Sequence, residues 1–368
     1  YYIYPVATLS GTIVGVGLFS LPFIALKVGT GTMIGYFLVL GSLVILIHSL
    51  FGEIALRTPD RLRLPGYAKV HLGSWAQKLA FVSSLTGFFG AILAYLIVGG
   101  EFLASLLSPV LGGGNIFYTI LYLSIGSLLI FGGIKMIAKI EFWGLIGFVA
   151  VLVLIYLRGQ KFIELDNFFI GGFNSEVRNW FLPYGPILFS LWGASLIPEL
   201  EEMLGEKKSL LKKVIFVSIL IPILVYLFFI YLVLGITGPA TTESAMAGLK
   251  NVLGDGIVTL GLFFGVITTF TSFIAIGLTL KKTLQYDLRF EKNLALAITC
   301  FLPLILFLLG VKSFIGVISF VGGVMLGIDG ILILLMYRKL NPHRFWVLPL
   351  ILVFFGGIIY EIMYSFGK

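Results

Sequence analysis

The chain has 368 residues, of which 59% are hydrophobic and 11% charged, and its formal net charge is +8. A mean hydropathy of +1.09 excludes a soluble globular domain of ordinary composition. The basic residues stand in short segments between apolar runs, where they orient a membrane protein, so we do not expect a nucleic-acid partner. The composition therefore predicts an all-α polytopic membrane protein in contact with the lipid bilayer.

Apolar runs of about 18 residues or more, long enough to cross the hydrocarbon core as helices, recur along the chain. Their ends are marked by charged residues, glycine and proline. The sequence predicts eleven transmembrane helices, at residues 2–27, 31–56, 76–107, 115–132, 138–157, 180–204, 210–236, 255–285, 293–310, 313–337 and 344–366.

The first span contains the stretch from Ser10 to Pro22, in which three glycines and a proline interrupt an apolar run. Each glycine costs roughly 1 kcal/mol relative to alanine inside a helix, and an unpaired backbone group is costly in hydrocarbon. We expect the helix to unwind between about Gly11 and Gly17, so that free carbonyls and free N–H groups face one site near the membrane midplane. The alternative is that the Gly-x-x-x-Gly spacing only allows another helix to approach closely.

The sixth span repeats this pattern, because Gly193 is followed by Pro198 as Gly17 is followed by Pro22. Spans one and six are five apart, and two repeats of five helices enter the membrane from opposite sides because five is odd. Paired interrupted helices in corresponding places of two halves indicate the binding site of a transporter. The predicted organisation is a first inverted repeat at 1–157, an external loop at 158–179, a second repeat at 180–338 and an added helix at 339–368.

Lysine and arginine are distributed unequally between the two sides that eleven spans define. Of the 25 basic residues, eighteen share a side with Lys208, and the remaining seven share a side with Arg178. Because basic residues concentrate in cytoplasmic loops, we expect a multi-pass protein of the inner or plasma membrane with a cytoplasmic N-terminus and an external C-terminus.

The chain resembles the amino acid–polyamine–organocation superfamily, most closely its amino acid/auxin permease and aromatic amino acid permease branches. The resemblance covers nearly the whole chain and rests on the span count and on two motifs, Gly11-Thr12-Ile13-Val14-Gly15-Val16-Gly17 with Leu21-Pro22 and Trp192-Gly193 with Ile197-Pro198-Glu199. It implies a LeuT-like fold of five plus five helices, in which discontinuous helices 1 and 6 hold an amino acid and the protein works by alternating access.

Elementary electrostatics supports the same ligand. Free N–H groups at the start of a helix bind a carboxylate, and free carbonyls at the end of a helix bind an ammonium group. An acidic residue of the superfamily's arginine–agmatine exchangers corresponds to Ser195 here, which implies a neutral L-amino acid. The predicted substrate-binding residues are Gly11, Thr12, Gly15, Val16, Gly17, Ala91, Tyr95, Phe189, Ser190, Trp192 and Ser195.

The resemblance also implies a coupling ion, since sodium-coupled members of the fold bind sodium between helices 1 and 8. The corresponding residues here are Gly11, Val14, Thr268, Thr271 and Ser272. The last three share one helix face, although such hydroxyls also bond back to their own helix. Proton coupling through Asp329 or Glu101, two carboxyl groups within predicted spans, is the alternative. Proton-coupled relatives carry a lysine in span five, whereas the part of this span from Phe142 to Leu157 contains none, and this favours Na⁺ over H⁺.

We therefore expect a secondary active symporter of neutral L-amino acids, coupled to sodium, with a proton-coupled symporter or an exchanger as the alternative. A non-transporting amino acid sensor on the same scaffold is a second alternative, which the lack of a sizeable soluble domain disfavours. No enzyme is expected, because the sequence has no metal-ligand spacing such as His-Glu-x-x-His and no nucleophile–base pattern. We expect no cofactor besides the ion, and the sequence is compatible with a monomer.

The charge distribution can be tested by labelling. Single cysteines that replace Lys208 and Gly171 should lie on opposite sides of the membrane, because the two positions fall on the basic-rich and the basic-poor side. In intact cells an impermeant maleimide should label only the cysteine at position 171. Labelling of both positions from the same side would contradict the eleven-span topology.

Overall fold

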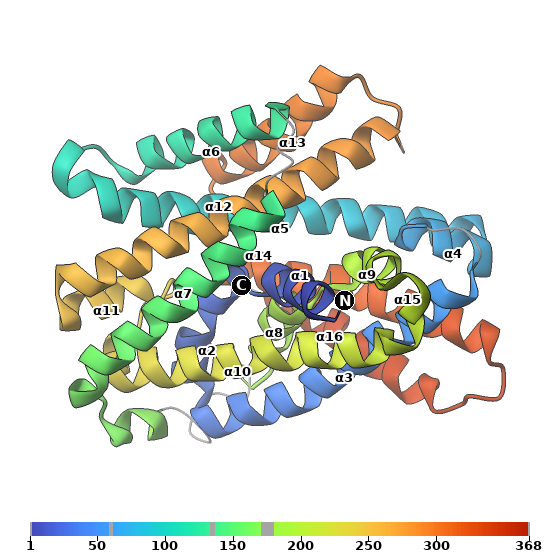
Figure 1. Ribbon diagram of the computed structural model, residues 1–368, viewed down its shortest axis with the longest axis horizontal. Helices are drawn as coiled ribbons and strands as arrows, with labels where there is room; N and C mark the ends of the chain where they lie inside the picture. The colour runs from blue at the N-terminus through green and yellow to red at the C-terminus, as the bar shows by residue number, and fades with distance from the viewer. Residues whose placement is uncertain (1, 59–61, 133–136, 171–179, 287, 367–368) are drawn as a thin grey trace.

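Helices make up almost all of the computed structural model, which describes residues 2–58, 62–132, 137–170, 180–286 and 288–366. Most of the long helices run along one direction, so that the described chain is a bundle (Figure 1). The α-helices are α1 (Ile3–Ile13), α2 (Leu21–Val28), α3 (Thr30–Arg57), α4 (Leu64–Leu72), α5 (Ser74–Leu111), α6 (Asn115–Gly132), α7 (Ile137–Gly159), α8 (Tyr184–Leu191), α9 (Ile197–Leu204), α10 (Leu211–Thr237), α11 (Met246–Leu253), α12 (Asp255–Tyr286), α13 (Lys292–Leu308), α14 (Phe314–Phe320), α15 (Leu326–Leu340) and α16 (Val347–Phe366).

Each predicted span contains at least one of these helices. Seven described helical segments are long and apolar enough to cross a membrane, and the bent pair of Ile3–Ile13 and Val16–Val28 makes an eighth candidate. The structure therefore confirms a helical multi-pass membrane protein, while the count of eleven spans stays a prediction.

Short helices of other geometry stand at the places where glycine and proline interrupt the apolar runs. The 3₁₀ helix η1 (Val16–Ser20) joins α1 to α2, and the 3₁₀ turn η5 (Ala194–Leu196) joins α8 to α9. A π-helical turn, η8 (Val321–Met325), joins α14 to α15. Helical π-turns often occur at functional positions, and η8 packs directly on α8.

The two ends of the bundle carry different short elements. The helices α4 and α9 lie at the end opposite to α11 (Figure 1). At the α4 end, Glu53 of α3 forms ion pairs with Arg57 at 2.6 Å and with Lys212 of α10 at 3.2 Å, and Lys208 pairs with Glu201 of α9 at 2.6 Å. The Glu53–Lys212 pair therefore joins α3 to α10, and the Glu201–Lys208 pair joins α9 to the segment before α10.

The predicted external loop at 158–179 begins with two 3₁₀ turns, η2 (Gln160–Phe162) and η3 (Leu165–Phe169). The side-chain amide of Asn167 donates to the Gly235 carbonyl at 2.9 Å, and the backbone N–H of Glu164 donates to the same oxygen at 3.0 Å. This part of the loop is therefore fastened to the end of α10. Gly171 lies outside the described residues, whereas Lys208 is described and exposed.

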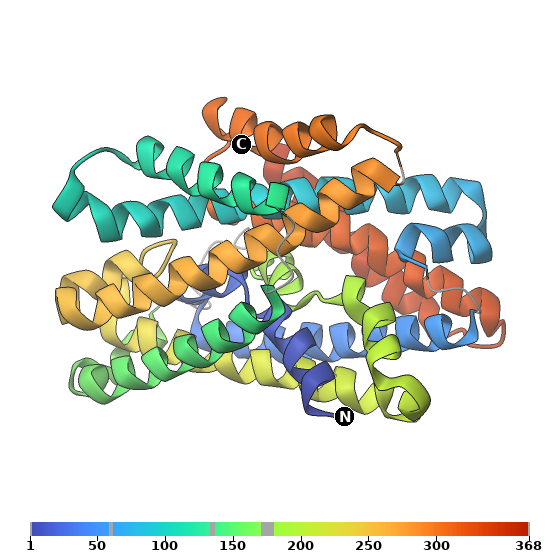
Figure 2. The same ribbon diagram turned by 45° about the horizontal axis from the view of Figure 1, so that its top comes forward.

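The break in the first span lies inside the bundle, surrounded by longer helices. In both views α6 and α13 lie at one side of the molecule, away from α1 and α2 (Figures 1 and 2). The ring of Phe19 in η1 packs edge-on against three other rings. Its centroid lies 4.7 Å from that of Phe102 in α5 and 5.8 Å from those of Phe148 in α7 and Phe229 in α10. Aromatic pairs of this kind contribute about 0.5–1.5 kcal/mol each beyond the area they bury, so three long helices hold η1 in place.

Candidate functional site

The first helix break lies at Val14 and Gly15. Val14 leaves the helical region with φ −73° and ψ 82°. The N–H of Gly15 would bond to the Gly11 carbonyl in a continuous helix, but it donates to the Ile13 carbonyl at 2.8 Å instead. The Gly11 carbonyl thus loses its helical donor. On the other side of the break, the N–H groups of Val16 and Gly17 have no acceptor among the described residues.

The second break lies at Trp192 and Gly193. Trp192 is extended, with φ −81° and ψ 122°. The N–H of Gly193 would bond to the Phe189 carbonyl in a continuous helix, but it donates to Nε2 of His48 at 2.9 Å. The Phe189 carbonyl loses its helical donor in the same way as the Gly11 carbonyl does. The predicted unwinding of both helices is therefore present.

His48 of α3 is a partner of the second break that was not predicted from the sequence. Its Nδ1 lies 2.8 Å from the Val44 carbonyl, and a carbonyl can only accept, so Nδ1 carries the proton and Nε2 is the acceptor. The ring is fully buried and packs edge-on against the Trp192 ring, with the two ring centroids 5.1 Å apart. The neutral imidazole therefore fixes the course of the backbone and the position of the Trp192 ring.

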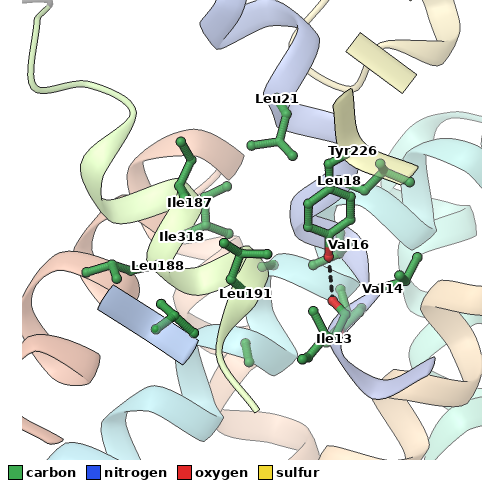
Figure 3. Packing of buried hydrophobic residues seen from close by; sticks show 14 of the residues in the cluster. Ile13, Val14, Val16, Leu18, Leu21, Ile187, Leu188, Leu191, Tyr226 and Ile318 are labelled. Atoms are coloured by element: carbon green, nitrogen blue, oxygen red, sulfur yellow. Dashed lines mark hydrogen bonds between the residues drawn. The ribbon is translucent and has the colours of Figure 1, made fainter. Parts of the chain in front are cut away.

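Tyr226 of α10 joins the two breaks. Its hydroxyl lies 2.6 Å from the Ile13 carbonyl and 2.8 Å from the Ser190 carbonyl. The hydroxyl has one hydrogen, so it donates to these two oxygens in turn or shares the hydrogen between them. Figure 3 shows Tyr226 above Ile13, and the apolar residues Ile187, Leu188 and Leu191 of α8 lie to the left of this pair.

Two glycines bring the broken helices into direct contact. A Cβ on Gly17 would stand 3.1 Å from Cα of Ser190 and would overlap its hydroxyl oxygen. A Cβ on Gly193 would stand 2.6 Å from a methyl group of Leu9 in α1. Close packing of helices thus accounts for the small side chain at both positions. The same packing sets the two groups of free backbone atoms side by side.

The other predicted substrate residues surround the breaks to different degrees. A Cβ on Gly15 would stand 2.5 Å from the Tyr95 hydroxyl, so Tyr95 of α5 lies against the first break. The Thr12 hydroxyl donates to the Thr8 carbonyl of its own helix at 3.0 Å. The remaining predicted residues differ in exposure. Ala91 and Val16 are buried, Gly11, Phe189 and Trp192 are half-buried, and Ser195 is exposed.

In the predicted sodium site Gly11 is half-buried and the other four residues are buried. The hydroxyls of Thr268 and Thr271 have partners on their own helix. The Thr268 hydroxyl donates to the Phe264 carbonyl at 3.0 Å, and the Thr271 hydroxyl donates to the Thr268 carbonyl at 3.1 Å. Such bonds within one helix are the alternative to sodium binding for these hydroxyls. A hydroxyl that donates its hydrogen keeps its oxygen lone pairs, so the geometry is compatible with both roles.

The two predicted proton-coupling carboxyls each accept a hydrogen bond from a serine. Asp329 of α15 is buried and bonded to the Ser83 hydroxyl of α5. Glu101 of α5 is half-buried and accepts from the Ser244 hydroxyl at 2.6 Å. Ser244 stands just before α11, so Glu101 fastens that segment to α5. A third buried carboxyl, Glu361 of α16, was not predicted as a site, although a lone acid in an apolar run was a usable signal.

A family model described as "Tryptophan/tyrosine permease family" matches residues 3–363. No curated protein matches the sequence. Two solved structures of similar fold are those of Mhp1, a nucleobase-cation-symport-1 family transporter, in a closed conformation with bromovinylhydantoin bound, and of MhsT in complex with L-phenylalanine.

The Mhp1 structure is 13% identical with a TM-score of 0.68, and the match covers 98% of this chain and 90% of that one. The MhsT structure is 13% identical with a TM-score of 0.66, over 97% and 98% of the two chains. An inward-facing conformation of Mhp1 is 12% identical with a TM-score of 0.70, over 98% and 88%. At such identities the likeness shows the fold, and it confirms the predicted fold class.

The bridging hydroxyl of Tyr226 can be removed without changing the ring. The Tyr226→Phe variant leaves two buried carbonyls without this donor, which should cost about 1–3 kcal/mol of stability. We expect a lower melting midpoint in detergent. Tyr231→Phe is the matched control, because Tyr231 lies on the same helix, is 38% exposed and stacks on Phe168. Equal melting of the two variants would show that the bridge does not stabilise the breaks.

Proposed function

The chain belongs to the tryptophan/tyrosine permease family, and on this premise we propose that it carries a neutral aromatic L-amino acid, such as tryptophan or tyrosine, by alternating access. Family and fold identify a secondary transporter rather than an enzyme. The proposal places it within the amino acid–polyamine–organocation superfamily, with residues 1–157 and 180–338 as the inverted repeats, 158–179 as the external loop and 339–368 as the added helix.

The observation that carries the proposal is the pair of helix breaks held together by Tyr226. The carbonyls of Gly11 and Phe189 have lost their helical donors, and the N–H groups of Val16 and Gly17 lack acceptors. An amino acid brings an ammonium group for the carbonyls and a carboxylate for the N–H groups. An α-amino acid carries both groups on one carbon, so its backbone suits this arrangement.

The side chains beside the breaks support an aromatic substrate. Trp192 and Phe189 are half-buried at the second break, and Tyr95 lies against the first. Aromatic rings pair favourably edge-on or offset with another ring. MhsT, which shares the fold, was solved with L-phenylalanine. These rings would form the specificity pocket, with Ala91 leaving room on α5 and Ser195 offering a hydroxyl in place of a charge.

We propose sodium as the coupling ion, held by the carbonyls of Gly11 and Val14 and by α12. The lost helical donor of the Gly11 carbonyl supports this choice, because a hard cation prefers such oxygen ligands. Mhp1 belongs to a cation-symport family, which agrees with an ion-coupled mechanism. Coupling to protons through Asp329 or Glu101 is the second candidate.

Uptake into proteoliposomes tests the substrate. Radiolabelled L-tryptophan should accumulate above the level of protein-free liposomes, and a panel of twenty unlabelled amino acids should rank tryptophan, tyrosine and phenylalanine as the strongest competitors. The reason is that the rings at the breaks favour an aromatic side chain and offer no charge. Strongest competition by lysine or glutamate, or no specific uptake, would refute the proposed substrate class.

The ion is tested separately with the Thr271→Ala, Ser272→Ala double variant. Wild-type uptake should rise with external sodium at fixed pH, and the double variant should lose that dependence because two hydroxyl ligands are gone. The control is Thr279→Ala on the same helix, whose hydroxyl donates to the Ala275 carbonyl. Uptake that ignores sodium and follows an imposed pH gradient instead would contradict the sodium assignment.

A further inference from the structure

A second group of buried polar side chains lies away from the two breaks. Tyr184 is the first residue of α8, Ser319 lies in α14, and Glu361 lies in α16. Their exposed fractions are 5%, 2% and 1%. The Tyr184 hydroxyl, the Ser319 hydroxyl and Oε2 of Glu361 each have no hydrogen-bond partner. Nearly all buried polar atoms in proteins are paired, so three unpaired oxygens in one cluster need a reason.

Glycines show how tightly these residues fit together. A Cβ on Gly185 of α8 would stand 2.7 Å from Oε1 of Glu361, and a Cβ on Gly323 of η8 would overlap the Glu361 side chain. A Cβ on Gly357 of α16 would overlap the ring of Tyr184. The Glu361 carboxyl therefore lies between η8 and the first turn of α8, while the Tyr184 ring lies on α16.

Among the described residues, no lysine or arginine forms a salt bridge with the Glu361 carboxyl. Tyr184 is the titratable residue of α8, and α14 and η8 carry none. On α15, Asp329 is bonded to Ser83 of α5, and Arg338 and Lys339 stand in the last turn, next to the connection to the first turn of α16, whereas Glu361 lies near the other end of α16. On α16 itself, Tyr360 and Tyr364 stack on each other, and from α3 Tyr36 interacts with Tyr184.

The contrast with the other two intramembrane carboxyls is informative. Asp329 and Glu101 each accept a hydrogen bond from a serine hydroxyl, whereas Ser319 stands near Glu361 with its hydroxyl unpaired. The backbone N–H of Gly185 donates to the Glu361 carboxyl, but Oε2 has no partner. An ionised carboxylate that is buried without a compensating charge is costly. A proton bound at Oε2 removes the charge and supplies the donor that the neighbouring hydroxyl oxygens lack. The cluster is therefore suited to hold a proton.

We propose that Glu361 is a proton-binding site that links protonation to the movement of α8. The inference rests on the proposed transport function and holds whether or not sodium also binds between α1 and α12. A proton from water forms an O–H bond at Oε2, and the neutral acid donates to a neighbouring hydroxyl, which keeps α8 packed on η8 and α16. When the proton returns to water, the carboxylate needs solvation and this packing loosens.

The position of the cluster explains how such a change reaches the substrate. A Cβ on Gly322 of η8 would meet the Gly185 carbonyl and stand 2.9 Å from the backbone nitrogen of Phe189. The helix α8 spans only Tyr184–Leu191, so its first turn contacts Glu361 and its last turn carries the free carbonyl of Phe189. A shift of this short helix moves both ends together.

The first test is independent of transport. Glu361→Gln keeps the size of the side chain and removes the titrating group. Infrared difference spectra of the purified full chain, recorded between acid and alkaline buffer, should contain a carboxylic acid C=O band that is absent in Glu361→Gln. Glu206→Gln, a change of an exposed glutamate on the segment after α9, is the matched control and should keep the band. A spectrum unchanged by Glu361→Gln would overturn the proposal.

The second test uses proteoliposomes with equal sodium on both sides. A pH gradient should drive L-tryptophan accumulation in the wild type, and Glu361→Gln should lower it about tenfold or more, within the usual range of coupling between sites. Exchange of internal for external tryptophan should persist, which shows that the variant is folded. Undiminished accumulation in Glu361→Gln, or a loss found only in Asp329→Asn, would overturn the proposal.

The two tests distinguish failure of the proposed transport function from failure of the proton site. If the wild type transports no aromatic amino acid, the proposed function fails, and the infrared band still decides whether Glu361 holds a proton. Sodium at fixed pH should not change the melting midpoint through this cluster. If sodium raises the midpoint of the wild type but not that of Glu361→Gln, the cluster is a cation site and the proton assignment is wrong.

Discussion

The structure depends on one constraint, which is that every backbone N–H and carbonyl group in hydrocarbon needs a partner inside the protein. A continuous helix meets this demand by itself, but the breaks at Gly15 and Gly193 do not. His48 accepts from the Gly193 N–H, and the Tyr226 hydroxyl donates toward the carbonyls of Ile13 and Ser190. The backbone groups that these side chains leave unpaired are the ones that a polar ligand can use.

The breaks are held by a firm frame, which makes a defined binding geometry compatible with movement. Phe19 is enclosed by rings from α5, α7 and α10, so η1 follows those helices. Gly17 sets η1 in contact with Ser190 of α8, and Gly193, which follows α8, packs against Leu9 of α1. A transporter of this kind moves largely by rocking of rigid parts around a fixed site, and α8, with its short length and glycine contacts to η8, is a natural element to move.

Three carboxyls within the helical bundle differ in their hydrogen-bond partners. This difference separates a structural role from a functional one. Glu101 fastens the segment before α11 through Ser244, and Asp329 joins α15 to α5 through Ser83. Glu361 keeps one oxygen without a partner although it is the most deeply buried of the three. A buried acid with one unpaired oxygen beside α8 is better explained by the proposed proton-binding role than by stability.

The sequence by itself determined the membrane class, the positions of the helices and the two broken helices, because hydropathy and helix-breaking residues act locally. It also predicted free backbone groups near Gly11, Val16 and Phe189, since a break frees groups at known offsets. Only the tertiary structure decided that His48 and Tyr226 pair with the breaks and that Gly17 faces Ser190, because these contacts join residues 36 to 213 positions apart in the chain. The sequence around a histidine or tyrosine does not indicate its partner, and only the packing of distant helices supplies that partner.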